Sequence, residues 1–213
     1  MAAHRLDVRF VARWIDILDK LVIAAEPRLT ELDAAIGDAD HGSNMTRATR
    51  ACRSALAASA PETTASAFSE VGRTLAQSIG GASGPLYGAI FLALGKSVPP
   101  STDIDPREFV VGMREALTSL QDLGAAAVGD KTMVDALAPA VATLEEQMDH
   151  RVDFIEAVAA AAAASEVGAV STIPLRARKG RASYLGPRSE GHQDPGATSS
   201  ALLFEALRLA VTP

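Results

Sequence analysis

The sequence predicts an all-α protein, on three observations. Alanine, the best helix former, recurs in runs, as in "EAVAAAAAASEV" over 156–167. Apolar residues recur every three or four positions along most of the chain. Runs of alternating β-branched residues, which would indicate strands, are scarce. The 213 residues are 48% hydrophobic but only 4% aromatic, so we expect one domain (1–213) whose core consists largely of Ala, Leu, Val and Ile.

The first half of the chain predicts five helices. Trp14, Ile15 and Leu18 belong to an amphipathic pattern in the first helix, and Pro27 suits the first turn of a second helix that Gly37 can end. Ser43 or Asn44 is expected near the cap of the third helix. The predicted ranges are 6–25, 27–36, 43–59, 63–80 and about 85–98.

The second half predicts four more helices after a loop at 99–106. They cover 107–124, 130–148, 153–175 and 197–211, and Pro139 is expected to kink the second of them. A long polar loop should precede the last helix, which Asp194 can cap and Pro195 can begin.

The charge and cysteine content exclude several classes of protein. A net charge of −6 argues against a nucleic-acid partner. The single cysteine, Cys52, allows no intrachain disulfide and fits a reducing compartment. The N-terminus lacks the apolar run of a signal peptide, and 154–167 is too short and too weakly hydrophobic to span a membrane. We therefore expect a cytoplasmic protein without a membrane partner.

The turn "ELDAAIGDADHGSNM" (31–45) concentrates negative charge. Asp33, Asp38 and Asp40 fall within eight residues, and the fifteen residues contain no lysine or arginine. Two such charges about 4 Å apart repel by about 4 kcal/mol at an effective dielectric constant of 20. If the turn brings the carboxylates together, a cation should lie between them, and oxygen ligands without a thiol favour Mg²⁺. The alternative is a solvated acidic turn with splayed side chains, and His41 beside it can be structural or catalytic.

Three other loops favour the metal site over the solvated turn. "GGASGPLYG" (80–88) places four glycines around a helix start, which suits an anion. "GDKTM" (129–133) offers polar groups at another helix start. "RARKGRASYLGPR" (176–188) is basic, and arginine donates two parallel hydrogen bonds to phosphate. Together the loops indicate a magnesium–nucleotide site at one end of a helical bundle.

Four stretches resemble the nucleotide-binding L subunit of dihydroxyacetone kinases. They are "AAIGDADHGSNM", "GGASGPLYG", "GDKTMVDALAPA" and "ARKGRASYLGPRSEGHQDPGATSSALL", and they extend from residue 34 to residue 203. The resemblance implies a closed barrel of about eight antiparallel amphipathic helices, with ADP or ATP bound at one rim.

The same resemblance implies a role for each matching residue. Asp33, Asp38 and Asp40 would hold two Mg²⁺ ions, and Ser83 and Arg181 would contact the phosphates. No residue is implied as a general base. The other implied nucleotide contacts are His41, Gly42, Ser43, Asn44, Ala82, Gly124, Thr132, Met133, Asp194, Pro195 and Gly196.

The chain by itself is expected to be half of an enzyme, because the family holds its ketone covalently on a histidine of another subunit or domain. We expect a dihydroxyacetone-binding partner subunit, with ADP kept as a fixed cofactor and recharged by a phosphohistidine carrier of the phosphotransferase system. Alternatives are an ATP-dependent kinase for another ketose such as erythrulose, and a non-catalytic nucleotide sensor that binds a regulator. A metal-dependent phosphohydrolase is a weaker alternative, and a homodimer stays open.

Overall fold

The structure, a computed structural model, describes residues 5–78, 80–81 and 83–212 and is almost entirely helical in this range. Two short strands, β1 (Leu6–Asp7) and β2 (Asp103–Ile104), pair in antiparallel fashion within it. The helices are α1 (Val8–Ile36), α2 (His41–Ser59), α3 (Thr64–Ser78), α4 (Ser83–Ser97), α5 (Pro106–Gly124), α6 (Val134–Asp149), α7 (Phe154–Ser171), the 3₁₀ helix η1 (Arg181–Ser189) and α8 (Pro195–Val211).

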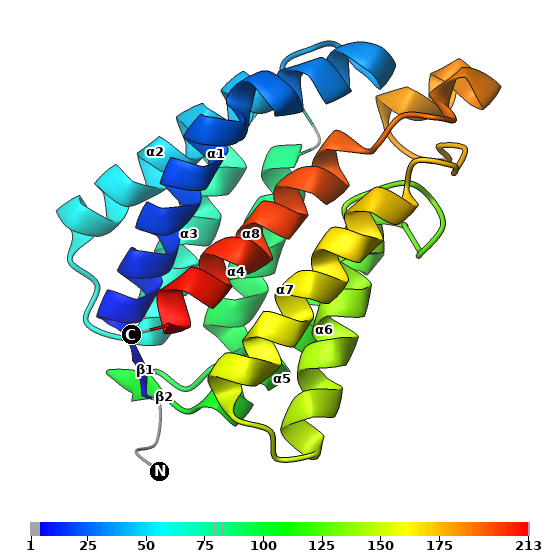
Figure 1. Cartoon of the computed structure of the whole chain (residues 1–213). Coiled ribbons are helices and arrows are strands. Elements are labelled where there is room, and N and C mark those ends of the chain that lie inside the picture. Colours follow the sequence, from blue (N-terminus) through cyan, green and yellow to red (C-terminus); the bar gives the residue numbers. More distant parts are fainter. Residues whose placement is uncertain (1–4, 79, 82, 213) are drawn as a thin grey trace.

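The eight α-helices form a closed ring. Each helix packs against the next one along the chain, and α8 packs against α1 as well as α7, which closes the barrel (Figure 1). Consecutive helices run antiparallel, so alternate connections gather at the same end of the barrel. The end of α1, the start of α2 and the segment η1 lie at one end, and β1 and β2 lie at the other (Figure 1). The predicted all-α barrel is confirmed.

The two helices predicted for residues 6–36 are one continuous helix, so that prediction was wrong. Pro27 lies inside α1. It lacks the N–H that would bond the carbonyl of Ile23. Pro27 and Ile23 are both exposed, so water can hydrate this carbonyl, while Val22 and Leu29 remain buried on the inner face. Packing along the whole length of α1 outweighs the missing hydrogen bond.

The predicted loop before the last helix also differs, because residues 181–189 form η1. The predicted cap is confirmed: Asp194 accepts a hydrogen bond from the Ala197 N–H at 2.7 Å, and Pro195 begins α8. Residues 99–106, predicted as a loop, contain β2.

The interior contains most of the few aromatic residues, which the composition did not predict. Trp14 lies at the centre, with ring centroids 5.4 Å from Phe91, 5.9 Å from Phe109 and 6.3 Å from Phe68. Its indole N–H donates to the Leu203 carbonyl at 3.0 Å, so the buried polar group is satisfied. Buried aromatic rings from six helices, namely α1, α3, α4, α5, α7 and α8, thus fill the barrel. The small residues allow the helices to approach each other.

Helix α7 is long and apolar enough to cross a membrane by length and composition. It packs against α6 and α8, and Ala157, Val158, Ala161 and Ala169 on it are fully buried. This packing accounts for the apolar residues on its buried face, whereas Val167 and Val170 on α7 are exposed.

Cys52 on α2 is buried, and its thiol lies 3.7 Å from the Val71 carbonyl of α3. Burial raises the pKa of this thiol to about 12. The thiolate, which is the reactive form, is therefore scarce at neutral pH.

The crossing of α3 and α4 gives a test of the packing. A Cβ at Gly72 would lie 2.7 Å from the Leu92 backbone nitrogen and 2.9 Å from the Gly88 carbonyl oxygen, too close for both. Gly72→Val should therefore lower the free energy of unfolding by about 1–3 kcal/mol or more, measured by urea denaturation. Gln77→Val, on the exposed face of the same helix, should change it by less than about 1 kcal/mol. Equal effects of the two substitutions would contradict the close crossing.

Candidate functional site

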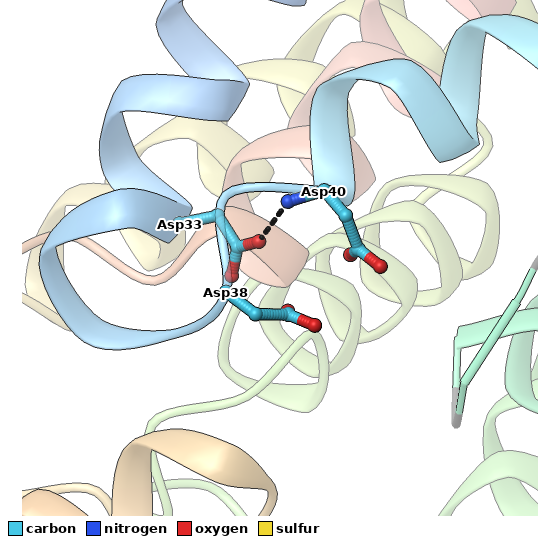
Figure 2. A group of neighbouring side chains, drawn as sticks. All are labelled: Asp33, Asp38 and Asp40. Carbon is cyan, nitrogen blue, oxygen red and sulfur yellow. Dashed lines mark hydrogen bonds between the residues drawn. The ribbon is translucent and has the colours of Figure 1, made fainter.

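The three aspartates converge at the α1–α2 turn. Asp33 lies in the last turn of α1, and Asp38 and Asp40 lie in the four residues between the helices. One carboxylate oxygen from each lies within 4.8 Å of the other two (Figure 2). Ala39 between them has a φ of 63°, a left-handed conformation that reverses the chain and brings both flanking aspartates round. Among the described residues, the splayed arrangement is thus not the one adopted.

Asp33 is fixed by the helix that follows it. Its Oδ2 accepts hydrogen bonds from the backbone N–H groups of Asp40 at 2.9 Å and His41 at 3.1 Å (Figure 2 draws the first). These N–H groups lie at the start of α2, where the helix dipole favours a negative charge. The unfavourable position of Asp33 at the end of α1 is therefore offset by the start of α2. The cap predicted at Ser43 or Asn44 was wrong, since α2 begins at His41.

The side chain of Asp33 covers Gly37, because a Cβ at Gly37 would overlap its Oδ1. A glycine is needed here for space rather than for an unusual φ, which is −144°. The Asp33 carboxylate can take its position only because residue 37 has no side chain.

The positive charge beside the cluster is Arg181 of η1, which pairs with Asp38. The Arg181 side chain is 63% exposed, and such a surface pair contributes little stabilisation. It does not compensate for three gathered carboxylates. The donor set consists of hard oxygen atoms near one point, which fits a divalent cation such as Mg²⁺.

A cavity of about 550 Å³ opens beside the cluster. This is within the usual range for a small-molecule site. Asp33, Asp38, Asp40 and Arg181 make one side polar. The lining also includes the apolar residues Leu86, Leu120, Leu123, Ala126 and Met133. The cavity therefore combines carboxylates that could hold a metal ion with side chains that suit an apolar group.

Most of the predicted site residues line this cavity. They are Asp33, Asp38, Asp40, His41, Ser83, Gly124, Thr132, Met133, Arg181, Asp194, Pro195 and Gly196. Ala82 lies outside the described residues.

Gly42, Ser43 and Asn44 are not among the lining residues. Gly42 faces α1, where a Cβ would overlap the Glu26 carbonyl oxygen. The Ser43 hydroxyl donates to the Asp40 carbonyl at 3.0 Å, and the Asn44 side-chain oxygen accepts from Arg47 at 2.6 Å. Successive residues of a helix point in directions about 100° apart, so Gly42 and Ser43 face away from His41, whereas Asn44 shares the side of His41 and lies near Gly80 of the cavity lining.

A buried polar network lies behind His41. Its Nε2 is 2.8 Å from the Ser199 hydroxyl, which is 2.7 Å from the Tyr87 hydroxyl. Burial raises the pKa of Tyr87 to about 12 and lowers the pKa of His41 below its ordinary value, although Asp33 and Asp40 oppose the second shift. Burial thus favours the neutral form of the His41 imidazole. Tyr87 was missed by the sequence reasoning, because its partners lie more than 100 residues away.

The 129–133 loop also differs from the prediction that a helix begins at Asp130. The carboxylate of Asp135 accepts from the N–H groups of Gly129 at 2.6 Å and Thr132 at 2.8 Å. Lys131 takes a φ of 62°, and α6 begins only at Val134. The loop is thus folded over Asp135, and it brings Lys131 to the cavity wall together with Thr132 and Met133.

Asp194 completes the wall at the start of α8. Burial raises its pKa to about 7, although the hydrogen bond from the Ala197 N–H favours the ionised form. Lys179, Leu86, Leu120 and Leu123 also line the cavity and were not predicted. The three leucines lie on helices, where their apolar spacing does not distinguish a cavity wall from the core.

Comparison with known proteins agrees with this geometry. A family model described as the DAK2 domain matches residues 35–209. The "PEP-dependent dihydroxyacetone kinase, ADP-binding subunit DhaL" of Escherichia coli (strain K12) is 38% identical over 94% of this chain and 95% of its own length. The "D-erythrulose kinase" of Mycolicibacterium smegmatis is 37% identical over 98% of this chain and 36% of its own length.

A solved structure gives the same fold. The dihydroxyacetone kinase from C. freundii in complex with AMP-PNP and Mg²⁺ aligns with a TM-score of 0.67 and 29% sequence identity. The alignment covers 93% of this chain and 33% of that one. The resemblance first seen in four loops thus extends over nearly the whole chain, which is similar to the DhaL subunits of dihydroxyacetone kinases, and the protein belongs to the DAK2 domain family.

Proposed function

We propose that this chain is the nucleotide-binding subunit of a dihydroxyacetone kinase and forms a single domain over residues 1–213. A magnesium nucleotide in the cavity would transfer its terminal phosphoryl group to dihydroxyacetone held by a partner subunit. The observation that carries the proposal is the convergence of Asp33, Asp38 and Asp40 beside a cavity of about 550 Å³. A nucleoside diphosphate requires a metal ion near its phosphates and apolar side chains around its base.

Each part of the cavity has a role in this proposal. The three carboxylates would hold Mg²⁺, as two ions, which neutralise phosphate charge when bound. Ser83 and the start of α4 would bind phosphate oxygens, and Arg181 would reach the phosphoryl group in transfer. Leu120, Leu123 and Met133 would cover the adenine ring. Phosphoryl transfer depends mainly on alignment and charge, so no general base is assigned.

The relatives support a proposal for the phosphate donor and the partners. The Escherichia coli relative is an ADP-binding subunit of a PEP-dependent kinase, and this chain matches it almost end to end. This supports a cytoplasmic protein that retains ADP and is recharged by a phosphohistidine carrier of the phosphotransferase system.

Phosphorylation of a related ketose is a second candidate, and the match to a D-erythrulose kinase favours it. That relative is about three times as long as this chain, and its ketose would be bound outside the matched part. An assay of the chain with its partner subunit, the carrier and a panel of ketoses separates the two. Product from dihydroxyacetone supports the first, and product from erythrulose alone supports the second. Absence of any ketose phosphate would contradict both and leave a nucleotide sensor.

Removal of one metal ligand should abolish nucleotide retention. In Asp38→Ala, two carboxylates remain, and we expect ADP to be lost from the purified protein, whereas helix content is kept because Asp38 lies in a turn. The nucleotide released on denaturation is measured by mass spectrometry, and helix content by circular dichroism. Asp149→Ala, which removes an exposed carboxylate at the far end of α6, is the control. ADP at full occupancy in Asp38→Ala would show that the metal assignment is wrong.

Gly37→Ala should weaken metal binding without removing any ligand. The new methyl group would occupy the place of the Asp33 carboxylate and force it to turn away. We expect the affinity for Mn²⁺, followed by electron paramagnetic resonance, to fall about tenfold or more. Ala34→Ser, on the exposed side of the same helical turn, should leave it unchanged. Wild-type affinity in Gly37→Ala would mean that Asp33 is not a ligand.

Arg181→Ala should slow phosphoryl transfer more than it weakens folding, because this side chain is largely exposed. We expect the rate constant of the chemical step to fall about 100-fold, the usual effect of losing one charge-stabilising donor. Single-turnover transfer to dihydroxyacetone measures it. Arg188→Ala, in the same η1 segment but outside the cavity lining, is the control. An equal loss in both variants would point to the general charge of η1 instead.

A further inference from the structure

Lys131 is a lysine in an unusual setting. Its side chain is among the largest that are fully buried, with 1% of its surface exposed. Its backbone has a φ of 62°, which non-glycine residues rarely adopt and which tends to be retained at functional sites. A buried ammonium group in a strained loop requires strong compensation from its surroundings.

The compensation comes from two segments far away in the sequence. The ammonium group donates to the Thr172 carbonyl at 2.7 Å and to the His192 carbonyl. Thr172 caps the C-terminus of α7, where the helix dipole favours a positive charge. Asp194 and Asp135 are negative neighbours that oppose the effect of burial on the pKa of Lys131. The lysine thus connects the loop before α6, the end of α7 and the turn before α8.

The turn before α8 is also bound to the end of α7. The Asp194 N–H donates to the Thr172 hydroxyl at 2.9 Å, and the Gly191 N–H donates to the Ile173 carbonyl at 2.8 Å. On the cavity side, a Cβ at Gly196 would lie 3.8 Å from Met133, so the loop and the turn adjoin. Both segments line the cavity.

We propose that Lys131 is a positioning residue of the nucleotide site, which ties the 129–133 loop to the 192–196 turn and so keeps two adjoining parts of the cavity wall in one arrangement. This inference rests on the proposed function for the ligand, but the tie itself is independent of it. Lys131 acts through Thr132, Met133 and the Asp194–Gly196 turn, not through the reacting groups.

The test compares two substitutions that each remove a side chain bridging two carbonyls. Lys131→Met keeps the length of the stem but removes the donors. Thr64→Val is the matched control: Thr64 is fully buried, and its hydroxyl lies 3.0 Å from the Leu6 carbonyl and 3.3 Å from the Thr102 carbonyl, beside the two strands. Both variants should lose stability, and both are studied well below their unfolding temperatures.

Two measurements are made on each variant. In Lys131→Met, we expect ADP to bind at least tenfold more weakly by calorimetry, and the amides of residues 190–196 to exchange with deuterium at least tenfold faster without nucleotide. Thr64→Val should bind ADP within twofold of the wild type, with unchanged exchange over 190–196. Mn²⁺ binding without nucleotide should be unchanged in both, since the aspartates are not tied to Lys131.

Other results overturn the proposal. Faster exchange with wild-type affinity would mean that the tie has no effect on the ligand, and weaker affinity without faster exchange would mean that Lys131 contacts the ligand directly. If wild-type protein binds no ADP, the proposed function fails, and the exchange of residues 190–196 still tests the tie. If Lys131→Met does not fold, Lys131→Gln decides, because its shorter, neutral side chain cannot bridge the carbonyls of Thr172 and His192 as the lysine does; ADP affinity and exchange equal to wild type would then overturn the proposal.

Discussion

The carboxylate of Asp33 joins the end of α1 to the start of α2, and the rest of the site depends on this contact. Its two hydrogen bonds from Asp40 and His41 fix the turn that carries the other two carboxylates. A helix start thereby stabilises a charge that a helix end would disfavour. The same contact orients His41 toward the cavity, since His41 opens α2. The two hydrogen bonds of Asp33 thus fix the positions of the carboxylates, the shape of the turn and the direction of α2.

The closed ring of helices explains why residues so distant in sequence share one cavity. Antiparallel neighbours return every second connection to the same rim, so the α1–α2 turn, the start of α4, the loop before α6 and the start of α8 all meet there. The packed aromatic interior keeps the helices in place, and the rim connections can then be irregular. The strained Lys131 and Ala39 both occur in these connections. A rigid wall with specialised loops is a common way to build a binding site.

The sequence was informative where the determining contacts are local. The periodicity of apolar residues predicted the helices, and the aspartates were found because they fall within eight positions. The continuity of α1 through Pro27 could not be predicted, because it depends on packing against α2 and α8. Tyr87 was missed, and the burial of Lys131 in the 129–133 loop was not foreseen, for the same reason, since their partners lie 112 and 41 residues away. Gly42 was assigned by resemblance to a continuous motif, whereas the turn of α2 directs it against α1 and away from the cavity.

The buried Cys52 has a practical consequence for the study of this protein in solution. It is the only cysteine of the chain, and burial keeps its thiol protonated at neutral pH. The wild-type protein therefore offers no accessible attachment point to maleimide dyes. A second cysteine placed at an exposed position such as Tyr184 on η1, which is 88% exposed, would react alone. A pair of such cysteines would thus report fluorescence or spin-label distances across the barrel rim without first removing a native sulfur atom.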